Sequence, residues 1–259
     1  MLLTLDVGNS EVTSGLFSGA ELRVRWRLTT AVDRTPDEWA VALESFILRA
    51  GHAPAEITAC CLASVVPGAT QSILPALQLV ISGRIGVVDA LAPLPIRLDV
   101  DEPATVGADR IAQALGALAL YPGPSVVVAF GTATTFNCIT EDRRFIGGSI
   151  MPGLRTSADQ LIRSAAKLAA TDLVPPPRAI GRNTEDNIRG GVLFGTADAV
   201  DGMVRRITAE WPGGARPRVI ATGGLASLVA PLATSIDVVN PDLTLRGLSV
   251  AAEAMRLIE

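Results

Sequence analysis

The chain has 259 residues, of which 49% are apolar, and its formal charge of −4 corresponds to an isoelectric point of about 5.2. That much apolar chain can bury a core in one large domain or in two smaller ones. Acidic and basic residues are interspersed rather than gathered in runs, which argues against nucleic acid or an anionic membrane and favours a small molecule or another protein as partner.

Two residue types are scarce enough to exclude whole classes of chemistry. His52 is the only histidine and Lys167 is the only lysine. A catalytic triad or a multi-histidine metal site would have to be built around His52, and neither a Walker A loop nor a protein-kinase lysine fits the sequence around Lys167. If the protein handles ATP, its phosphates must be held by backbone amides, hydroxyl groups, arginine and Mg²⁺.

The sequence also indicates a compartment. The three cysteines, Cys60, Cys61 and Cys138, lie in apolar runs, as reduced core thiols do. The first residues lack a basic segment and Asp6 interrupts their apolar run, so we expect no signal peptide, and no apolar stretch reaches membrane-spanning length. We therefore expect a cytoplasmic protein.

The first part of the chain alternates between strand-like and helix-like patterns. An apolar helix is expected at its end, over residues 107–120, after a stretch spaced by prolines. This alternation is typical of an α/β domain. The other elements expected here are strands over 2–6, 11–17, 21–28 and 57–64 and helices over 37–50 and 69–80.

The second part begins like the first, with strands expected over 125–130, 134–139 and 144–146. Residues 3–10 (LTLDVGNS) and 126–133 (VVVAFGTA) share a strand, a glycine and small polar residues after it. We interpret this as an internal duplication. It predicts two similar α/β halves, residues 1–115 and 116–259, that face one another across a central cleft.

The two matching glycine turns carry groups suited to phosphate. Glycine tolerates positive φ and close approach, so backbone N–H groups and neighbouring hydroxyls can reach phosphate oxygens. Asp6, at the end of the first strand, could hold Mg²⁺ through its oxygens. By itself the first turn could equally be a plain hairpin, and its duplicate argues against that alternative. The residues concerned are Gly8, Asn9 and Ser10 in the first turn and Gly131 and Thr132 in the second.

A third glycine turn contains Thr222, Gly223 and Gly224 and follows a strand expected over 218–221. In a two-lobed kinase such a turn would border the adenine and the ribose. It could equally be an ordinary connection from a strand to a helix.

The tetrapeptide Gly107-Ala108-Asp109-Arg110 begins the apolar helix between the two halves. Asp109 could take the proton of an attacking hydroxyl, and Arg110 could bind an anionic substrate or stabilise phosphoryl charge. Alternatively, Asp109 is a first-turn carboxylate that complements the helix dipole.

Two further segments precede expected helices. The glycine-rich run over residues 147–153 reads as a loop that enters a helix, and residues 181–184 (GRNT) precede another helix. Each could be no more than a helix cap, or could line a substrate pocket.

Taken in order, these segments resemble the type III pantothenate kinases over nearly the full chain. The matching runs are DVGNS at 6–10, SVVP at 64–67, Pro103 with GADR at 107–110, FGTATTF at 130–136, GGSIMPG at 147–153, GRNT at 181–184, ATGG at 221–224 and LTLRGL at 243–248.

The resemblance implies the duplicated fold of actin, Hsc70 and the acetate and sugar kinases, which is of the ribonuclease H-like ATPase type. It also implies a homodimer that transfers the γ-phosphate of ATP to the hydroxyl of pantothenate, the first step towards coenzyme A. Asp109 looks like the catalytic base, and Thr184 could reach pantothenate across the dimer interface. The implied pantothenate site includes Val100, Gly107, Ala108, Arg110 and Thr184, and the implied ATP and Mg²⁺ site includes Asp6, Gly8, Asn9, Ser10, Gly131, Thr132, Thr222, Gly223 and Gly224.

Two departures from the family pattern concern function. Ala129 stands where the family usually has an aspartate associated with a monovalent cation, K⁺ or NH₄⁺, beside the triphosphate. Val100 stands where the family often has a tyrosine, which would form an aromatic wall of the pantothenate pocket. A methyl group cannot ligate a cation, so the resemblance implies either altered cation dependence or the loss of most of the kinase activity.

Three functional hypotheses follow. The first is an ATP-dependent pantothenate kinase, because Asp6, Asp109, Arg110 and Thr184 are all present. The second is a catalytically impaired relative that acts as an ATP-binding or regulatory protein, because of Ala129 and Val100. The third is a kinase for another small acid that bears a hydroxyl group.

Overall fold

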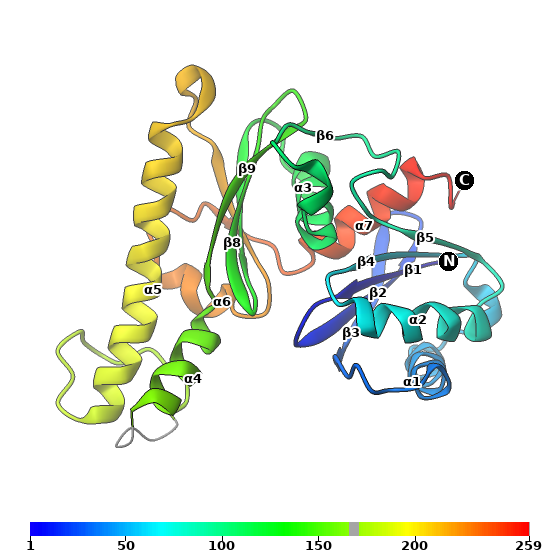
Figure 1. The fold of residues 1–259 in the computed structure, drawn as a ribbon, viewed down its shortest axis with the longest axis horizontal. Helices are drawn as coiled ribbons and strands as arrows, with labels where there is room; N and C mark the ends of the chain where they lie inside the picture. The colour runs from blue at the N-terminus through cyan, green and yellow to red at the C-terminus, as the bar shows by residue number, and fades with distance from the viewer. Residues whose placement is uncertain (166–170, 259) are drawn as a thin grey trace. The chain divides into compact units, whose positions relative to one another are not determined.

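The computed structural model describes residues 1–165 and 171–258, which form two compact units (Figure 1). The first unit consists of Met1–Leu120, Arg143–Phe145 and Leu243–Glu259, and the second of Tyr121–Asp142 and Ile146–Asp242. Lys167 lies outside the described residues. No helix within the described ranges is long and apolar enough to cross a membrane.

A five-stranded sheet in the order β3-β2-β1-β4-β5 forms the centre of the first unit. The central strand, β1, pairs antiparallel with β2 and parallel with β4, which agrees with the predicted order of three strands, a helix and a further strand. Its strands are β1 (Leu2–Val7), β2 (Glu11–Ser18), β3 (Glu21–Thr29), β4 (Ala59–Ser64) and β5 (Arg84–Val87).

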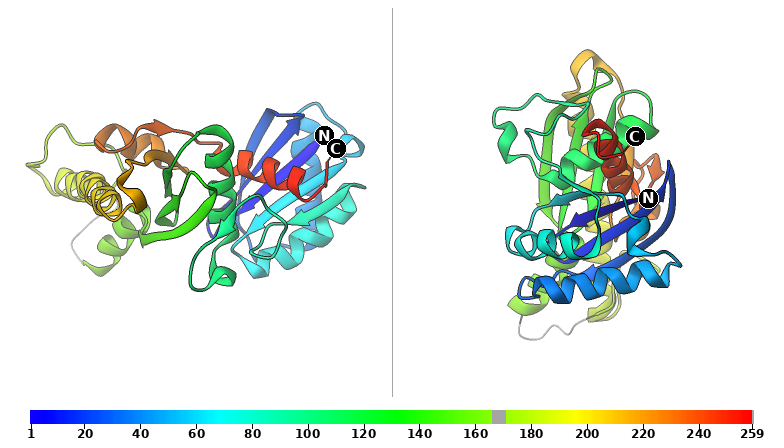
Figure 2. Two further views of the ribbon diagram at one scale, coloured as in Figure 1. Left: turned by 90° about the horizontal axis from the view of Figure 1, so that it is seen from above. Right: turned by 90° about the vertical axis from the view of Figure 1, so that its right-hand side faces the viewer.

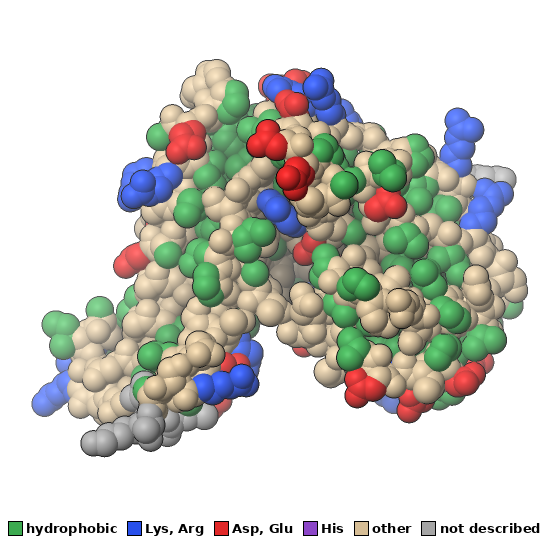
Figure 3. Space-filling view, viewed as in Figure 1, with side chains coloured by type: hydrophobic (Ala, Val, Ile, Leu, Met, Phe, Trp, Pro, Cys, Tyr) green, Lys and Arg blue, Asp and Glu red, His purple; other side chains and the backbone are tan. Residues whose placement is uncertain are grey.

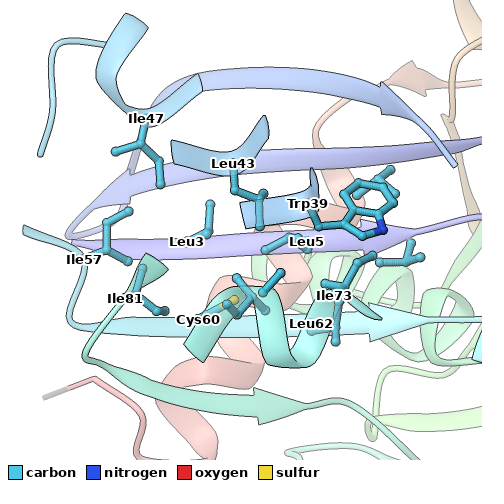
Figure 4. Packing of buried hydrophobic residues seen from close by; sticks show 14 of the residues in the cluster. Leu3, Leu5, Trp39, Leu43, Ile47, Ile57, Cys60, Leu62, Ile73 and Ile81 are labelled. Carbon is cyan, nitrogen blue, oxygen red and sulfur yellow. The ribbon is translucent and has the colours of Figure 1, made fainter. Parts of the chain in front are cut away.

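Helices α1 (Pro36–Arg49) and α2 (Pro67–Val80) cover one face of this sheet. Successive strand residues point to opposite faces, so Leu3 and Leu5 of β1 enter the core under α1 (Figure 4). The start of α1 is fixed by a capping box, in which Thr35 and Glu38 satisfy each other's backbone N–H groups. A short 3₁₀ turn, η1 (Pro54–Glu56), leads into β4.

Helices α3 (Ala108–Leu120) and α7 (Leu243–Ala254) cover the opposite face, as the views in Figures 1 and 2 agree. Their backbones touch at two glycines. A Cβ atom at Gly116 would lie 2.3 Å from the carbonyl oxygen of Leu243, and one at Gly247 would lie 1.7 Å from that of Ala112. Only glycine fits at either position. The turn η2 (Pro103–Thr105) precedes α3.

The second sheet has the order β11-β10-β7-β8-β9-β6. The first residues of β9 belong to the first unit, where Arg144 and Phe145 pair with Arg97 and Leu98 of β6. The strands are β6 (Arg97–Leu98), β7 (Ser125–Phe130), β8 (Ala133–Ile139), β9 (Arg144–Pro152), β10 (Arg218–Thr222) and β11 (Val238–Val239).

A core of strand and helix residues fills one face of β7, β8 and β10, with Val128, Phe136 and Leu193 among its buried members. The long helix α5 begins at a cap in which the Asn183 side chain accepts a hydrogen bond from the Asp186 N–H at 2.8 Å. The helical segments are α4 (Leu154–Ser164), α5 (Thr184–Ala209), η3 (Pro212–Gly214), α6 (Ala226–Val229) and η4 (Ala230–Leu232).

The internal duplication is confirmed by strand pairing. In the first unit β1 lies between the antiparallel β2 and the parallel β4, and in the second unit β7 lies between the antiparallel β8 and the parallel β10. Asp6 and Ala129 each stand two residues before the glycine of the turn, so they occupy equivalent positions.

One predicted loop is a strand. Residues 147–152 continue β9 instead of forming a loop, with φ of 108° at Gly147 and 156° at Gly148. Two adjacent glycines are typical of a turn, but sheet pairing holds them in the strand.

Candidate functional site

The first glycine turn joins β1 to β2 and is supported by the end of β3. The Gly8 N–H donates to the Glu11 carbonyl at 3.0 Å. Thr30, just after β3, donates from its hydroxyl to the Gly8 carbonyl at 2.6 Å and from its N–H to the Ser10 carbonyl at 3.0 Å. The backbone of this turn is therefore fixed before any ligand binds, while Asn9 and Ser10 are exposed.

Asp6 is the carboxyl group of this unit whose pKa is raised most. Across the sheet it pairs with Thr13 on β2 and Ala63 on β4. The residue keeps some exposed surface, but its Oδ1 atom is enclosed and has no hydrogen-bond partner. Burial, and secondly the negative charge of Asp109, raise its pKa to about 7.

These features of Asp6 fit a divalent cation. An enclosed carboxylate oxygen without a donor is costly, and a bound cation would remove that cost and draw the pKa down. The described residues contain no group of three or more His, Cys, Asp or Glu side chains that could hold a metal. A metal at Asp6 would therefore share its ligands with phosphate and water, as Mg²⁺ commonly does.

Asp109 lies in the first turn of α3. Its carboxylate accepts a hydrogen bond from the Arg110 N–H at 2.8 Å. Burial raises its pKa, although that hydrogen bond and the charge of Arg110 oppose the shift. The negative charge of Asp109 is also one of the two causes that raise the pKa of Asp6, so the charge of one predicted carboxyl group reaches the other.

Gly107 leaves room for the carboxylate of Asp109. A Cβ atom at Gly107 would lie 2.5 Å from Oδ1 of Asp109 and 3.5 Å from Cγ1 of Val65. Ala108, the next residue, is buried, and Val100 is half-buried in the segment after β6. A side chain at position 107 would therefore displace the carboxylate of Asp109.

Arg110, the other polar residue of this turn, lies over the ring of Phe145, with 5.1 Å between Cζ and the ring centroid. The sequence does not predict a role for Phe145, because its segment indicates only a returning strand. The pair is separated by 35 positions in the chain, and no local pattern could have joined it.

The second glycine turn lies in the second unit, between β7 and β8. The Gly131 N–H donates to the Ala133 carbonyl at 3.0 Å. The Thr132 carbonyl accepts from the Gly153 N–H at 3.1 Å and from the Thr156 hydroxyl at 2.7 Å. The start of α4 thus supports this turn as the end of β3 supports the first one.

Ala129 stands in the middle of a row of three paired residues, with Thr222 of β10 on one side and Thr135 of β8 on the other. Paired residues point to the same face of a sheet. The hydroxyl oxygens of Thr135 and Thr222 are both enclosed and have no hydrogen-bond partner. The methyl group of Ala129 offers no oxygen to a cation, so this position does not fit the monovalent site that the family pattern implies.

The third glycine turn directly follows Thr222. Gly223 has a φ of 92°, and a Cβ atom there would lie 2.5 Å from the Phe130 carbonyl oxygen. This turn therefore packs against the end of β7, beside Ala129 and Gly131, and Gly224 next to it is exposed. The structure brings these predicted nucleotide residues of the second unit together.

Thr184 is the first residue of α5 and is exposed. A groove of about 290 Å³ runs between α4 and α5, lined by residues that include Leu161, Ile188, Gly191 and Gly195. Cβ positions at Gly191 and Gly195 have no neighbouring atom within 4 Å. Thr184 belongs to the same helix and stands three residues before Asn187, which also lines the groove.

Comparison with known proteins gives a consistent result. The sequence model of the type III pantothenate kinase family matches residues 2–206. A type III pantothenate kinase from Thermomicrobium roseum is 44% identical over 255 residues, which cover 98% of this chain and 98% of that protein. The one from Roseiflexus sp. is 43% identical over 256 residues, which cover 99% of this chain and 100% of that protein.

Among solved structures, MreB 5 of Spiroplasma citri bound to AMPPNP has a TM-score of 0.58 at 11% identity, covering 98% of this chain and 96% of that chain. At that identity the likeness shows the fold alone, and it confirms the predicted actin-like architecture. The family match over most of the sequence and the near full-length relatives show that the chain belongs to the type III pantothenate kinases.

Proposed function

We propose that the protein transfers the γ-phosphate of ATP to the hydroxyl group of pantothenate and forms 4′-phosphopantothenate, the first step of coenzyme A synthesis. The observation that carries the proposal is the pair of carboxyl groups at Asp6 and Asp109, both with raised pKa values, in a member of this kinase family. Two carboxyl groups on an open surface would have neither the enclosed oxygen of Asp6 nor pKa values raised by burial.

Each carboxyl group has its own task. Asp109 accepts the proton of the attacking hydroxyl as its oxygen bonds to the γ-phosphorus, while the bond from that phosphorus to the β-phosphate oxygen breaks and ADP leaves. Asp6 holds Mg²⁺, which supplies charge neutralisation at the phosphates when it is bound. Exposed residues of the two glycine turns, Asn9 after Gly8 and Thr132 after Gly131, contact phosphate oxygens.

Two predicted residues bind the acceptor. Arg110 binds the carboxylate of pantothenate, since a guanidinium group matches a carboxylate with two parallel hydrogen bonds. Thr184 contacts pantothenate from the other subunit of a homodimer. The turn with Thr222, Gly223 and Gly224 borders the nucleoside part of ATP.

The homodimer is supported by the groove between α4 and α5. Leu161 is 43% exposed at its edge, and the open surface over Gly191 and Gly195 lets a second helix approach closely. We propose that a second copy of the chain covers this groove.

We place the reaction in the cytoplasm, because the three cysteines are buried thiols. We also propose that the activity is independent of K⁺ and NH₄⁺, because Ala129 supplies no ligand. A non-catalytic relative is the less favoured alternative, since both carboxyl groups are retained and the relatives carry kinase names.

The test is direct. Purified protein with ATP, Mg²⁺ and pantothenate should yield ADP and 4′-phosphopantothenate in equal amounts. The isosteric variant Asp109→Asn should lower kcat by roughly 10²- to 10⁴-fold and retain ATP binding. Absence of product at every Mg²⁺ and K⁺ concentration would remove the proposal. If the protein phosphorylates a different hydroxy acid in a substrate panel and does not phosphorylate pantothenate, that acid would replace pantothenate as the proposed substrate.

A further inference from the structure

The contact between Arg110 and Phe145 can position the guanidinium group of Arg110 for the proposed reaction. The guanidinium carbon of Arg110 lies 5.1 Å from the ring centroid of Phe145, within the range of a cation–π interaction. Stacking engages the flat face of a guanidinium group, whereas its N–H groups point outward in its own plane. The ring therefore restricts where Arg110 can present its N–H groups.

Phe145 is itself held firmly. Its side chain is 1% exposed, and its carbonyl accepts a hydrogen bond from the Asp99 N–H at 2.8 Å. The neighbouring residue, Arg144, forms an ion pair of 2.9 Å with the Asp99 carboxylate. Burial, strand pairing and this ion pair together keep the ring in one place.

The same anchor holds the segment that leads to Val100. Asp99 is bonded to β9 through both its backbone and its side chain, and Val100 is the next residue. Arg144 and Phe145 of β9 therefore hold the start of the segment that leads to α3. Phe145 also supplies the ring that contacts Arg110. A change at Phe145 would act on Arg110 first, because the backbone bonds to Asp99 do not require the ring.

We propose that Phe145 is a positioning residue that orients Arg110 towards the carboxylate of the acceptor substrate. This inference rests on the proposed function, because it takes the acceptor to be a carboxylic acid bound by Arg110. A long arginine side chain has many rotamers, and a ring that selects one of them lowers the ordering cost of binding. Phe145 thereby sets affinity for the acid and leaves the chemical step to Asp109.

The chain offers a matched control. Arg246 lies over the ring of Phe17 at 5.4 Å, and Phe17 is also 1% exposed. Phe17 belongs to the same unit, and the arginine over its ring is carried by α7 rather than by the first turn of α3. Phe17→Leu and Phe145→Leu thus remove the same ring from two similar stacks.

The experiment compares steady-state kinetics of the wild type with Phe145→Leu, Phe145→Tyr and Phe17→Leu. For Phe145→Leu we expect the KM for pantothenate to rise roughly 3- to 30-fold, the range that a partly buried cation–π contact supports, with little change in kcat or in the KM for ATP. Phe145→Tyr keeps a ring face and should restore the KM. Phe17→Leu should lower the melting temperature to a similar extent and leave the KM unchanged.

A second acceptor separates orientation of Arg110 from general damage. In pantothenyl alcohol a CH₂OH group replaces the carboxylate, so the wild type and Phe145→Leu should use it equally poorly. An equal loss on both acceptors, an unchanged KM for pantothenate, or failure of tyrosine to rescue would each overturn the inference while the proposed function stands. A wild type that never phosphorylates pantothenate would overturn both.

Discussion

At the scale of single residues, the carboxyl group of Asp6 destabilises the ligand-free protein. Its pKa is raised from 3.8 to about 7, so the unfolded chain loses this proton near pH 4 whereas the folded chain keeps it until about pH 7. Between these values the unfolded state binds fewer protons, and the free energy of unfolding falls as the pH rises. The stabilising effect of the neutral form is fully present below pH 4 and is lost above 7.

We therefore expect Asp6→Asn to stabilise the ligand-free protein by roughly 1–3 kcal/mol at pH 8, although it removes activity. The gain should shrink as the pH falls and vanish near pH 4, because the wild-type side chain is then neutral as well. Thermal unfolding of both proteins between pH 4 and 8 measures this difference. A gain that does not depend on pH would show that ionisation of Asp6 is not its source.

The row across Ala129 supports a second prediction. A carboxylate at this position would meet two hydroxyl donors, Thr135 and Thr222, which have no partner now. Ala129→Asp should therefore fold well and make the rate depend on K⁺ or NH₄⁺, with a gain of up to roughly 10²-fold at saturating cation. Initial rates in Na⁺, K⁺ and NH₄⁺ buffers test this. A variant that is faster in all buffers alike, or no faster in any, would contradict it.

At the scale of elements, the crossing of α3 and α7 leaves the least room for an added side chain. A Cβ atom at Gly247 would lie 1.7 Å from the Ala112 carbonyl oxygen, so Gly247→Ala must push the helices apart. We expect a loss of about 3 kcal/mol or more in stability, and lower activity because α3 carries Asp109. Gly202→Ala on α5 is the control, because its nearest neighbour is a flexible arginine side chain at 3.7 Å. That change should be neutral or stabilising by up to about 1 kcal/mol.

Local patterns predict most elements of this fold, because a few consecutive residues are enough to favour a strand or a turn. The two glycine turns and the strands on either side of each could be read in this way, and strand pairing places Asp6 and Ala129 at equivalent positions. Contacts across long distances in sequence could not be read. The packing of α7 on α3 and of Phe145 under Arg110 depends on which segments meet in space.

The candidate site was predictable to a similar degree. Asp6, Asp109 and the three glycine turns follow from residue type and position at the ends of strands and helices. Thr222 is predicted only as part of a glycine turn, and Thr135 is not predicted as a site residue, because threonine is common in strands. Only sheet register reveals that their enclosed hydroxyls flank Ala129. A Cβ atom at Gly107 would displace the carboxylate of Asp109, and no local turn pattern predicts this contact.

At the scale of the whole molecule, surface charge gives little guidance to partners. Acidic and basic side chains lie dispersed among each other on the face shown in Figure 3. The proposed dimer depends instead on the apolar groove between α4 and α5. In that dimer, Asp109 of one subunit and Thr184 of the other would serve the same substrate, although each lies in a different unit of its own chain.

Mixing two defective variants tests whether Thr184 acts across the interface. Asp109→Asn lacks the base, and Thr184→Ala lacks the contact to pantothenate. If Thr184 acts on the opposite subunit, a mixed dimer contains one site with both residues intact, so random exchange at equal concentrations restores about a quarter of all sites. If Thr184 acts within its own chain, the mixed dimer has no intact site and its rate is the mean of the two parents. Gly195→Leu, which fills the groove, should abolish the recovery by yielding monomers in light scattering, and recovery by a monomeric variant would refute the shared site.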